Sequence, residues 1–336
     1  MLIVTERVAE RLVSMDEAIN VVEDAFARLY RGEAEVFPVV AGRGDRADTF
    51  FGVKSGVIDA AALVGFKIGT YWPANRLRSL AAHASTTFLL DGETGRLRAL
   101  LASSYLTCVR TAAADGVGIR HLSRPESTTV GMVGAGHQAW FELKAACEVR
   151  PIKRVLVWNR TPIAGETFAR RVREELHIEA STADLRSAVE EADIVITSTA
   201  SREPLVSHEW VRPGTHISAM GSDAVGKGEL SPALIRLGRL FCDVVDQSIT
   251  LGDFESAFLA GLIDRNGIVP LGAVITGDNP GRTSEADITI FDSSGTALQD
   301  LAIGGLVLSK AVAQGLAEQI DTVGEERPTS RLKSLQ

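Results

Sequence analysis

The sequence predicts an α/β fold in which a Rossmann-type, doubly wound parallel sheet is joined to a second, discontinuous α+β domain. Three observations predict it. From residue 128 onward apolar strand-like runs alternate with helical segments, a glycine-rich turn separates the first such run from the helix after it, and residues 36–101 read instead as short β-type runs between turns. With 336 residues the chain exceeds the ~100–200 typical of one domain, so we expect two.

The first domain is expected to begin with an amphipathic helix over residues 15–31. Ser14 and Glu17 form a capping box, and apolar residues then recur at helical spacing. The β-type runs that follow predict an antiparallel sheet, with DGETG as a hairpin turn. A second helix is expected to start near Ser104 or Thr107 and to stop around His121.

The second domain is expected to hold the parallel sheet, because strands that alternate with helices require crossover connections. A final helix, from about Gly295 to Gln319, is long enough to leave this sheet and pack on the first domain. We therefore expect residues 1–120 plus 305–325 to form one domain and residues 121–304 the other. The polar stretch at 326–336 is expected to be a loose tail.

The composition excludes several classes of function. Hydrophobic residues make up 45%, charged residues 23%, and the net charge of −8 leaves no basic footprint for nucleic acid. No run approaches the ~20 apolar residues of a membrane helix, so we expect neither membrane association nor export. Cys108, Cys147 and Cys242 lack the spacing of a metal site or disulfide framework, which predicts reduced thiols, no metal and a cytoplasmic protein.

A dinucleotide site is predicted at VGMVGAGHQAW. Gly134 and Gly136, with Ala139 in the third position, follow a strand and open a helix, so backbone can approach a pyrophosphate at the helix N-terminus. The next strand ends in WNRT, where an NAD-binding protein often has an acid. Arg160 can pair with a 2′-phosphate, and Asn159 and Thr161 can donate to it, so NADPH is expected. NADH remains open if Arg160 is a solvated surface cation.

Three polar stretches outside this fingerprint are candidates for chemistry. Lys67 lies among apolar neighbours and either reaches solvent or faces a cleft. Arg110 lies early in a helix of small residues, where a cation opposes the helix dipole and suggests a bound anion. Asp223, in a glycine-rich loop with Lys227, follows a parallel strand and is placed to move a proton, or merely forms a turn.

Two further positions have an ordinary structural interpretation beside the functional one. Ser293 precedes the last helix and would by default be its N-cap. His83, in the segment HASTT, would by default be a structural histidine in a strand.

The chain resembles the ornithine cyclodeaminase and mu-crystallin family. The resemblance rests on GFK, WPAN, DGETG, VRTAAA, VGAGHQA, WNRT, GSDAVGK and IFDSSG, which occur in this order over about residues 1–320. It implies a homodimer whose discontinuous domain binds substrate and dimerises, and hydride transfer between imino and amino acids. It also implies that Lys67 and Arg110 bind the substrate carboxylate and that Asp223 is the general acid/base, so Asp223 and Lys67 are the candidate catalytic residues.

The resemblance adds residues to the expected cofactor and substrate sites. The candidate cofactor-binding residues are Gly134, Gly136, His137, Gln138, Asn159, Arg160, Thr161, Thr199, Met220, Lys227 and Ser293. The candidate substrate-binding residues are Lys54, Ser55, Lys67, His83 and Arg110.

One departure from the family pattern bears on the substrate. Members that cyclise ornithine have an Arg after the Pro that corresponds to Pro38, whereas this chain has Val39. FPVV, KSG and YWPAN are instead similar to the iminosuccinate reductases of the family, which use NADH. Because an extra cation such as Lys54 or Arg43 suits a second carboxylate and opposes an ammonium group, we expect a dicarboxylic imino acid, unless Lys54 points to solvent.

The leading hypothesis is therefore an imino-acid (ketimine) reductase that transfers hydride from NADPH to the C=N of a small, possibly dicarboxylic α-imino acid and yields an L-amino acid. An ornithine cyclodeaminase-type ammonia-lyase is the first alternative. The second is a non-catalytic, mu-crystallin-like binding protein, although the joint presence of Lys67, Arg110 and Asp223 speaks against a decayed site.

Overall fold

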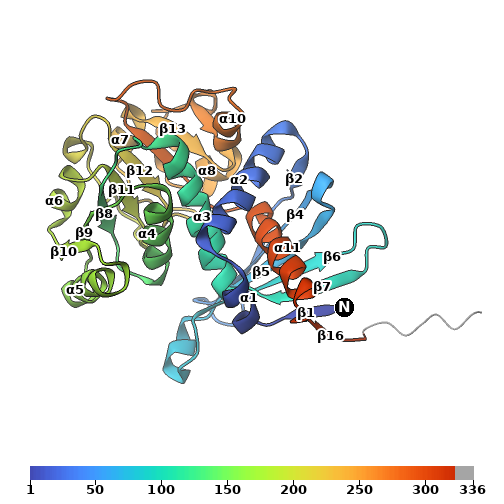
Figure 1. Cartoon of the computed structure of the whole chain (residues 1–336). Helices are drawn as coiled ribbons and strands as arrows, with labels where there is room; N and C mark the ends of the chain where they lie inside the picture. The colour runs from blue at the N-terminus through green and yellow to red at the C-terminus, as the bar shows by residue number, and fades with distance from the viewer. Residues whose placement is uncertain (322–336) are drawn as a thin grey trace, which may run out of the picture.

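Two β-sheets organise the chain into two lobes that share a central helix (Figure 1). The structure is a computed structural model, and it describes residues 1–321. The expected α/β fold with a doubly wound parallel sheet is confirmed.

The first sheet has the strand order β16-β1-β7-β6-β5-β4-β2, with β3 also paired to β4. Its strands are β1 (Leu2–Val4), β2 (Ala34–Val36), β3 (Val40–Gly42), β4 (Phe50–Ile58), β5 (Leu63–Tyr71), β6 (His83–Leu90), β7 (Leu97–Ala102) and β16 (Glu318–Gln319). The strands from β2 to β7 pair antiparallel as expected, and β1 adds a parallel partner to β7.

Helices cover one face of the first sheet. They are α1 (Glu6–Leu12), α2 (Met15–Arg31), α3 (Ser104–Leu122) and α11 (Ala297–Ala313). The capping box predicted for α2 is present, and Gly32 ends that helix in the left-handed region at φ 73°. Helix α11 contacts β4, β5 and β6. Gly56 in β4 and Gly65 in β5 leave room for the side chains of Leu298 and Leu301 of this helix.

The last helix differs from its expected length. It ends at Ala313, and Glu318–Gln319 pair with β1 as a strand, so the expectation of a helix to Gln319 was wrong. The turn after Ala313, with Gly315 at φ 66°, ends the helix. The expected domain boundary at residues 304/305 falls inside this continuous helix, and the expected tail at 326–336 lies outside the described residues.

The second sheet is parallel throughout, in the order β10-β9-β8-β11-β12-β15-β13-β14. Its strands are β8 (Thr129–Val133), β9 (Arg154–Trp158), β10 (Glu179–Thr182), β11 (Ile194–Thr197), β12 (His216–Ala219), β13 (Arg239–Cys242), β14 (Ile268–Pro270) and β15 (Thr289–Asp292). The connecting helices are α4 (His137–Val149), α5 (Pro162–Arg171), α6 (Leu185–Glu190), α7 (Pro232–Leu237), α8 (Val245–Leu251), α9 (Glu255–Leu259) and α10 (Leu271–Ile275). The strand order reverses between β8 and β11, which is where ligands of such sheets bind.

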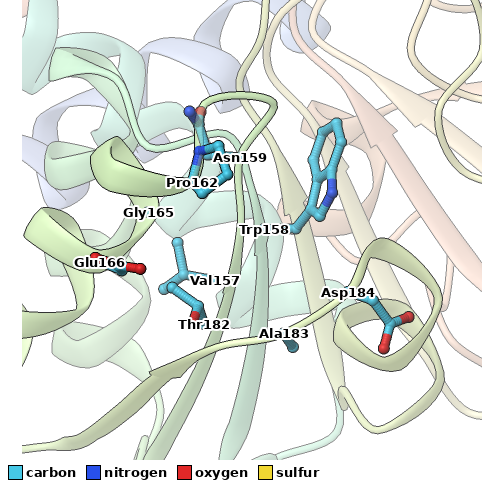
Figure 2. A pocket seen from close by; sticks show the side chains of 9 residues that line it. All are labelled: Val157, Trp158, Asn159, Pro162, Gly165, Glu166, Thr182, Ala183 and Asp184. Atoms are coloured by element: carbon cyan, nitrogen blue, oxygen red, sulfur yellow. The ribbon is translucent and has the colours of Figure 1, made fainter.

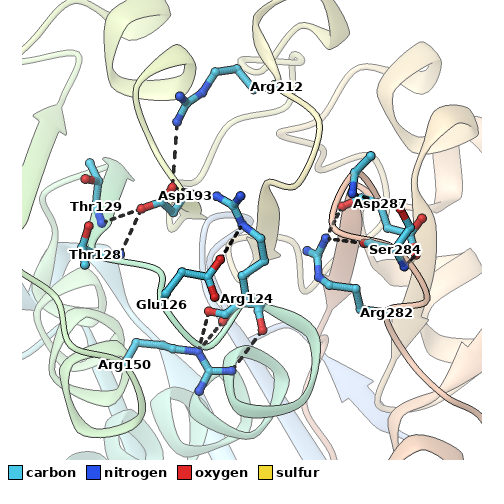
Figure 3. A network of polar contacts seen from close by, with 12 residues as sticks. Arg124, Glu126, Thr128, Thr129, Arg150, Asp193, Arg212, Arg282, Ser284 and Asp287 are labelled. Carbon is cyan, nitrogen blue, oxygen red and sulfur yellow. Dashed lines mark hydrogen bonds and ion pairs between the residues drawn. The ribbon is translucent and has the colours of Figure 1, made fainter.

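Helix α3 lies between the lobes and contacts α2, α4, β6 and β12. Its C-terminus is held by a polar network around Arg150 (Figure 3). Arg150 donates to the carbonyls of Ile119, Arg120 and Ser123 at 2.7–3.1 Å, and a cation at this end of a helix also complements its dipole. The network fixes α3 to the second sheet at the edge opposite the strand carboxyl ends.

Candidate functional site

The glycine-rich turn after β8 has the geometry of a phosphate loop. Gly134 has φ 112°, and a Cβ there would lie 2.6 Å from the carbonyl oxygen of Ser198, so only glycine fits. A Cβ on Gly136 would meet nothing within 4 Å, and Gly136 offers no side-chain acceptor to the first turn of α4. The helix N-terminus, where His137 is exposed, is therefore open to an anion.

Asn159 connects this loop to the end of β9. Its Oδ1 accepts from Ala135 N at 3.1 Å, and its Nδ2 donates to Thr161 O at 3.0 Å. Both ends of the amide are thus used to shape the loop, which was not foreseen for a residue expected to donate to a phosphate. Arg160 and Thr161 are exposed, and within residues 1–321 Arg160 has no ion pair.

A cavity of about 400 Å³ adjoins this strand end between β9, β10 and α5 (Figure 2). It is lined by Val157, Trp158, Asn159, Pro162, Gly165, Glu166, Thr182, Ala183 and Asp184. The negative charges of the exposed Glu166 and Asp184 carboxylates disfavour binding of a phosphate inside the cavity. Arg160 is not among the residues that line this cavity.

Asp223 lies in the exposed loop after β12 and pairs with Lys227, whose Nζ is 2.5 Å from Asp223 Oδ1. Desolvation by the surrounding protein would raise the pKa of Asp223, although its side chain is itself exposed, but the positive charge and hydrogen bond of Lys227, with the charges of Lys54 and His83, lower it below its usual value. Asp223 is therefore a carboxylate at neutral pH. Lys54 and His83 belong to the first sheet, so the two lobes meet at this residue.

Buried acids brace the loop that carries Asp223. Glu229 Oε1 accepts from Thr199 N at 2.7 Å and its Oε2 from Gly221 N at 3.0 Å, which ties the end of β11 to the end of β12. Asp253 Oδ1 in turn accepts from the backbone N–H groups of Glu229 and Leu230 at 2.7 and 2.8 Å. The positions of Thr199 and Asp223 thus depend on two acids that the sequence interpretation did not single out.

Three cations, Lys54, Lys67 and Arg110, gather beside this loop, and we call them the cation cluster. Lys54 and Lys67 are direct cross-strand partners in β4 and β5, so their side chains leave the same face of the sheet. Arg110 reaches them from the second turn of α3. Lys67 and Arg110 are 5% and 8% exposed, so each needs an anionic or polar partner.

Those partners come from the start of α11 and the loop before it. Asp300 Oδ1 lies 2.9 Å from Lys67 Nζ and 3.1 Å from Arg110 Nε. Gln299 Oε1 accepts from Arg110 Nη1 at 2.7 Å, and Lys54 Nζ donates to the carbonyls of Ser294 and Gly295 at 2.9 and 2.8 Å. Because Ser294 and Gly295 follow β15, this segment brings the cluster to the carboxyl edge of the second sheet.

Burial and the crowding of positive charge lower the pKa of both lysines. For Lys67 the causes are burial, then Arg110 and Lys54, and Asp300 opposes them, so that its pKa falls to about 7. Burial and Arg110 likewise lower the pKa of Lys54. Three cations that face one directly paired carboxylate form a site with an excess of positive charge, which favours an anionic ligand.

The other expected residues fall into two groups. His83 lies on the same face of the first sheet as Lys67. It packs against Tyr71, with 4.5 Å between the ring centroids. Ser55, by contrast, lies on the opposite face of β4 from Lys54, opposite Phe66, because side chains alternate along a strand. The geometry therefore does not bring Ser55 into the site.

Three cofactor candidates make contacts within the protein. Ser293 Oγ donates to Asp243 Oδ2 at 3.0 Å, and the residue at the N-cap position of α11 is Thr296, so the default expectation that Ser293 is an N-cap was wrong. Gln138 Nε2 donates to Cys108 O and Glu142 Oε1. Met220 is buried directly after β12.

Asp300 and Gln299 are the site residues that the sequence interpretation missed. The available signal was an adjacent polar and acidic pair in a helix that is otherwise apolar and mostly buried. Nothing local indicated which distant cations they contact. Within residues 1–321 no group of three or more metal-ligating side chains is found, and no helix there is long and apolar enough to span a membrane.

Comparison with known proteins gives matches over nearly the whole chain. The model of the ornithine cyclodeaminase/mu-crystallin family matches residues 1–315. The chain is 39% identical over 321 residues to the iminosuccinate reductase of Paracoccus denitrificans, covering 96% of this chain and 100% of that protein. The crystal structure of that reductase in complex with NAD+ superposes with a TM-score of 0.92 and covers 96% of this chain and 99% of that chain.

Two further solved structures are similar. The Thermococcus litoralis Δ1-pyrroline-2-carboxylate reductase, in complex with NADH and L-proline, is 32% identical with a TM-score of 0.91 and covers 95% of this chain and 100% of that chain. An archaeal alanine dehydrogenase, a dimer with bound NAD, is also 32% identical with a TM-score of 0.91 and covers 96% and 99% of the two chains.

Proposed function

The chain belongs to the ornithine cyclodeaminase/mu-crystallin family, and from this premise we propose that it is an NAD(P)H-dependent reductase of a small α-imino acid, which it converts to an L-amino acid. The observation that carries the proposal is the cation cluster, which lies beside a carboxylate, Asp223, at the carboxyl edge of a dinucleotide-binding sheet. The relatives named as iminosuccinate and pyrroline-2-carboxylate reductases support the same reaction type.

Each part of the site has a role in this reaction. The bound nicotinamide supplies the hydride. Lys67 and Arg110 bind the α-carboxylate and so hold the C=N carbon in one orientation, an effect that can remove ~7–11 kcal/mol of barrier. Asp223, a carboxylate at neutral pH, holds the N–H of the protonated imine and accepts a proton from the amine in the reverse direction.

We also propose that the substrate carries a second carboxylate. Lys54 points into the cluster rather than to solvent, and two acceptors, the carbonyls of Ser294 and Gly295, use two of its three N–H groups. The remaining N–H can serve a second carboxylate. Arg43, the other candidate, is exposed on the segment after β3, so Lys54 is the better supported.

The cofactor preference is also a proposal. The relatives compared above bind NAD+, NADH or NAD, whereas the exposed cation Arg160 at the end of β9 supports NADPH, with NADH as the alternative.

We further propose a cytoplasmic homodimer. The three cysteines are free, and the archaeal alanine dehydrogenase is a dimer. The face of the first sheet opposite α11 carries half-buried aromatic residues, including the stacked pair Phe66 and Phe88, which a second subunit would cover. A monomeric elution volume in size-exclusion chromatography would contradict the dimer.

The test of function follows nicotinamide absorbance with purified protein. NADPH and NADH are offered in parallel with oxaloacetate, pyruvate or glyoxylate, each with excess ammonia. We expect oxidation of the nicotinamide cofactor that requires both ammonia and oxaloacetate. Asp223→Ala should lower the rate of this oxidation at least ~100-fold. Full turnover in that variant would remove the role of Asp223. If neither NADPH nor NADH is oxidised with any of the keto acids, the reductase proposal is overturned. The next test would then be release of ammonia from ornithine at constant cofactor.

A further inference from the structure

Asp300 joins two cations of the substrate site through a single oxygen atom. Its Oδ1 contacts both Lys67 Nζ and Arg110 Nε, at 2.9 and 3.1 Å, and the side chain is 3% exposed. Its Oδ2 has no hydrogen-bond partner among residues 1–321. Lys67 comes from β5, Arg110 from α3 and Asp300 from α11, so three elements distant in sequence meet at this atom.

We propose that Asp300 is a positioning residue for substrate binding: it fixes Lys67 and Arg110 on one oxygen and supplies a negative charge between them, so that both side chains present their remaining N–H groups to the same carboxylate. This inference rests on the proposed function only in taking the ligand to be a carboxylate. We assign Asp300 a positioning role and not a catalytic one, because its side chain is 3% exposed and its Oδ1 is held by the two cations.

The balance of charge around Lys67 shows why the carboxylate matters. The titratable or charged groups that face Lys67 are Arg110 and Cys108 from α3, Lys54 from β4 and Asp300 from α11, while β6 contributes the neutral Thr87. Two of these groups are cations, and the Cys108 thiol is neutral because burial raises its pKa to about 11. Asp300 is therefore the group in direct contact that favours the charged form of Lys67.

The consequence is a defined pH dependence. Because the pKa of Lys67 is lowered to about 7, anion binding should weaken as pH rises above that value, by about tenfold per unit. Loss of the Asp300 charge should move this decline to lower pH. If the shift is about one unit, the variant binds an anion about tenfold more weakly at about pH 8 but less than about threefold more weakly at about pH 6.

The experiment measures binding of succinate to the full-length protein by calorimetry, in saturating NADH, at these two pH values. Succinate is a dicarboxylate that cannot be reduced, and its own titration cancels between variants. Asp300→Asn keeps the shape and one oxygen acceptor but removes the charge. Asp115→Asn is the matched control, because Asp115 is a buried acid of α3 that is not paired with Lys67 or Arg110.

We expect Asp300→Asn to bind succinate more weakly than the wild type, by a factor that increases from pH 6 to pH 8. In Asp115→Asn this factor should not increase. Equal losses at both pH values would show a merely structural role and overturn the proposal. Should Asp300→Asn fail to fold, Lys67→Arg provides the second test: a guanidinium keeps its charge at both pH values, so the wild-type pH dependence should disappear. Its persistence would identify another titrating group and overturn the proposal.

Binding and turnover separate this inference from the proposed function. Normal pH-dependent binding of succinate without any imine reduction would refute the reaction and leave the role of Asp300 intact. If the wild-type protein bound neither succinate nor propionate, the carboxylate site itself would be refuted, and the role of Asp300 with it.

Discussion

Removal of Glu229 should detach the loop of Asp223 from the second sheet. The two carboxylate oxygens accept from Thr199 N and Gly221 N, and the side chain is fully buried. Each buried N–H that loses its acceptor costs about 1–3 kcal/mol, so Glu229→Ala should lower the free energy of unfolding by about 2–6 kcal/mol. Glu229→Gln keeps one oxygen acceptor and turns its amide NH2, a donor, toward the other N–H, so it should lower the free energy of unfolding by about 1–3 kcal/mol.

The assay is urea unfolding followed by the fluorescence of the four tryptophans, of which Trp140, Trp158 and Trp210 lie in the second lobe and Trp72 in the first. Ser55→Ala, on the outer face of β4, is the control and should change stability by less than about 0.5 kcal/mol. We expect the free energy of unfolding to decrease from wild type to Glu229→Gln to Glu229→Ala. The apparent KM for the cofactor should rise in the same order, because the backbone N–H of Thr199 loses its acceptor. A loss below about 1 kcal/mol in Glu229→Ala would refute the assigned bracing.

Three other predictions test separate parts of the molecule. Arg160→Ser should raise KM for NADPH at least about tenfold and change KM for NADH less than about twofold in steady-state kinetics, and equal effects on both cofactors would exclude a 2′-phosphate contact. Arg150→Met should lower the free energy of unfolding by about 2–4 kcal/mol in urea titrations, and Arg150→Lys should restore less than half, because an ammonium cannot reach the same set of carbonyls. Burial raises the pKa of Asp115 from 3.8 to about 7, so its contribution to stability is present at low pH and is lost as pH rises from about 4 to about 7. Relative to wild type, Asp115→Asn should therefore gain more than about 1 kcal/mol between pH 5 and pH 8 in thermal unfolding, and parallel curves would contradict the buried titration.

Features that depend on neighbouring residues were predictable from the sequence alone. The capping box of Ser14 and Glu17, the helix that follows it and the glycine turn at Gly134 all have local causes, namely hydrogen bonds within one turn and a backbone angle that glycine allows. The alternation of strands and helices after residue 128 likewise predicted a parallel sheet, because such connections permit few other arrangements.

The end of the last helix had a local signal, Gly315 at φ 66°, which the expectation of a helix to Gln319 passed over. The pairing of Glu318 with Ile3 in β1, at the other end of the chain, had none. A contact across more than 300 residues has no local signature. Ser55, by contrast, could have been excluded from the site by the sequence alone, because side chains alternate along a strand and Lys54 and its direct neighbour cannot face the same site.

The sequence by itself determined the dinucleotide-binding fold and the kinds of residue at the site, because glycine turns, caps and periodicity act within one element. Only the tertiary structure decided how the cations Lys54, Lys67 and Arg110 find polar and charged partners, because those partners lie on the last helix and the loop before it, which return from the second sheet to the first. Asp300 is 233 positions from Lys67 in sequence but 2.9 Å from it in space. Burial of like charges is tolerated only where such a partner arrives, and the folding of both lobes is what brings it.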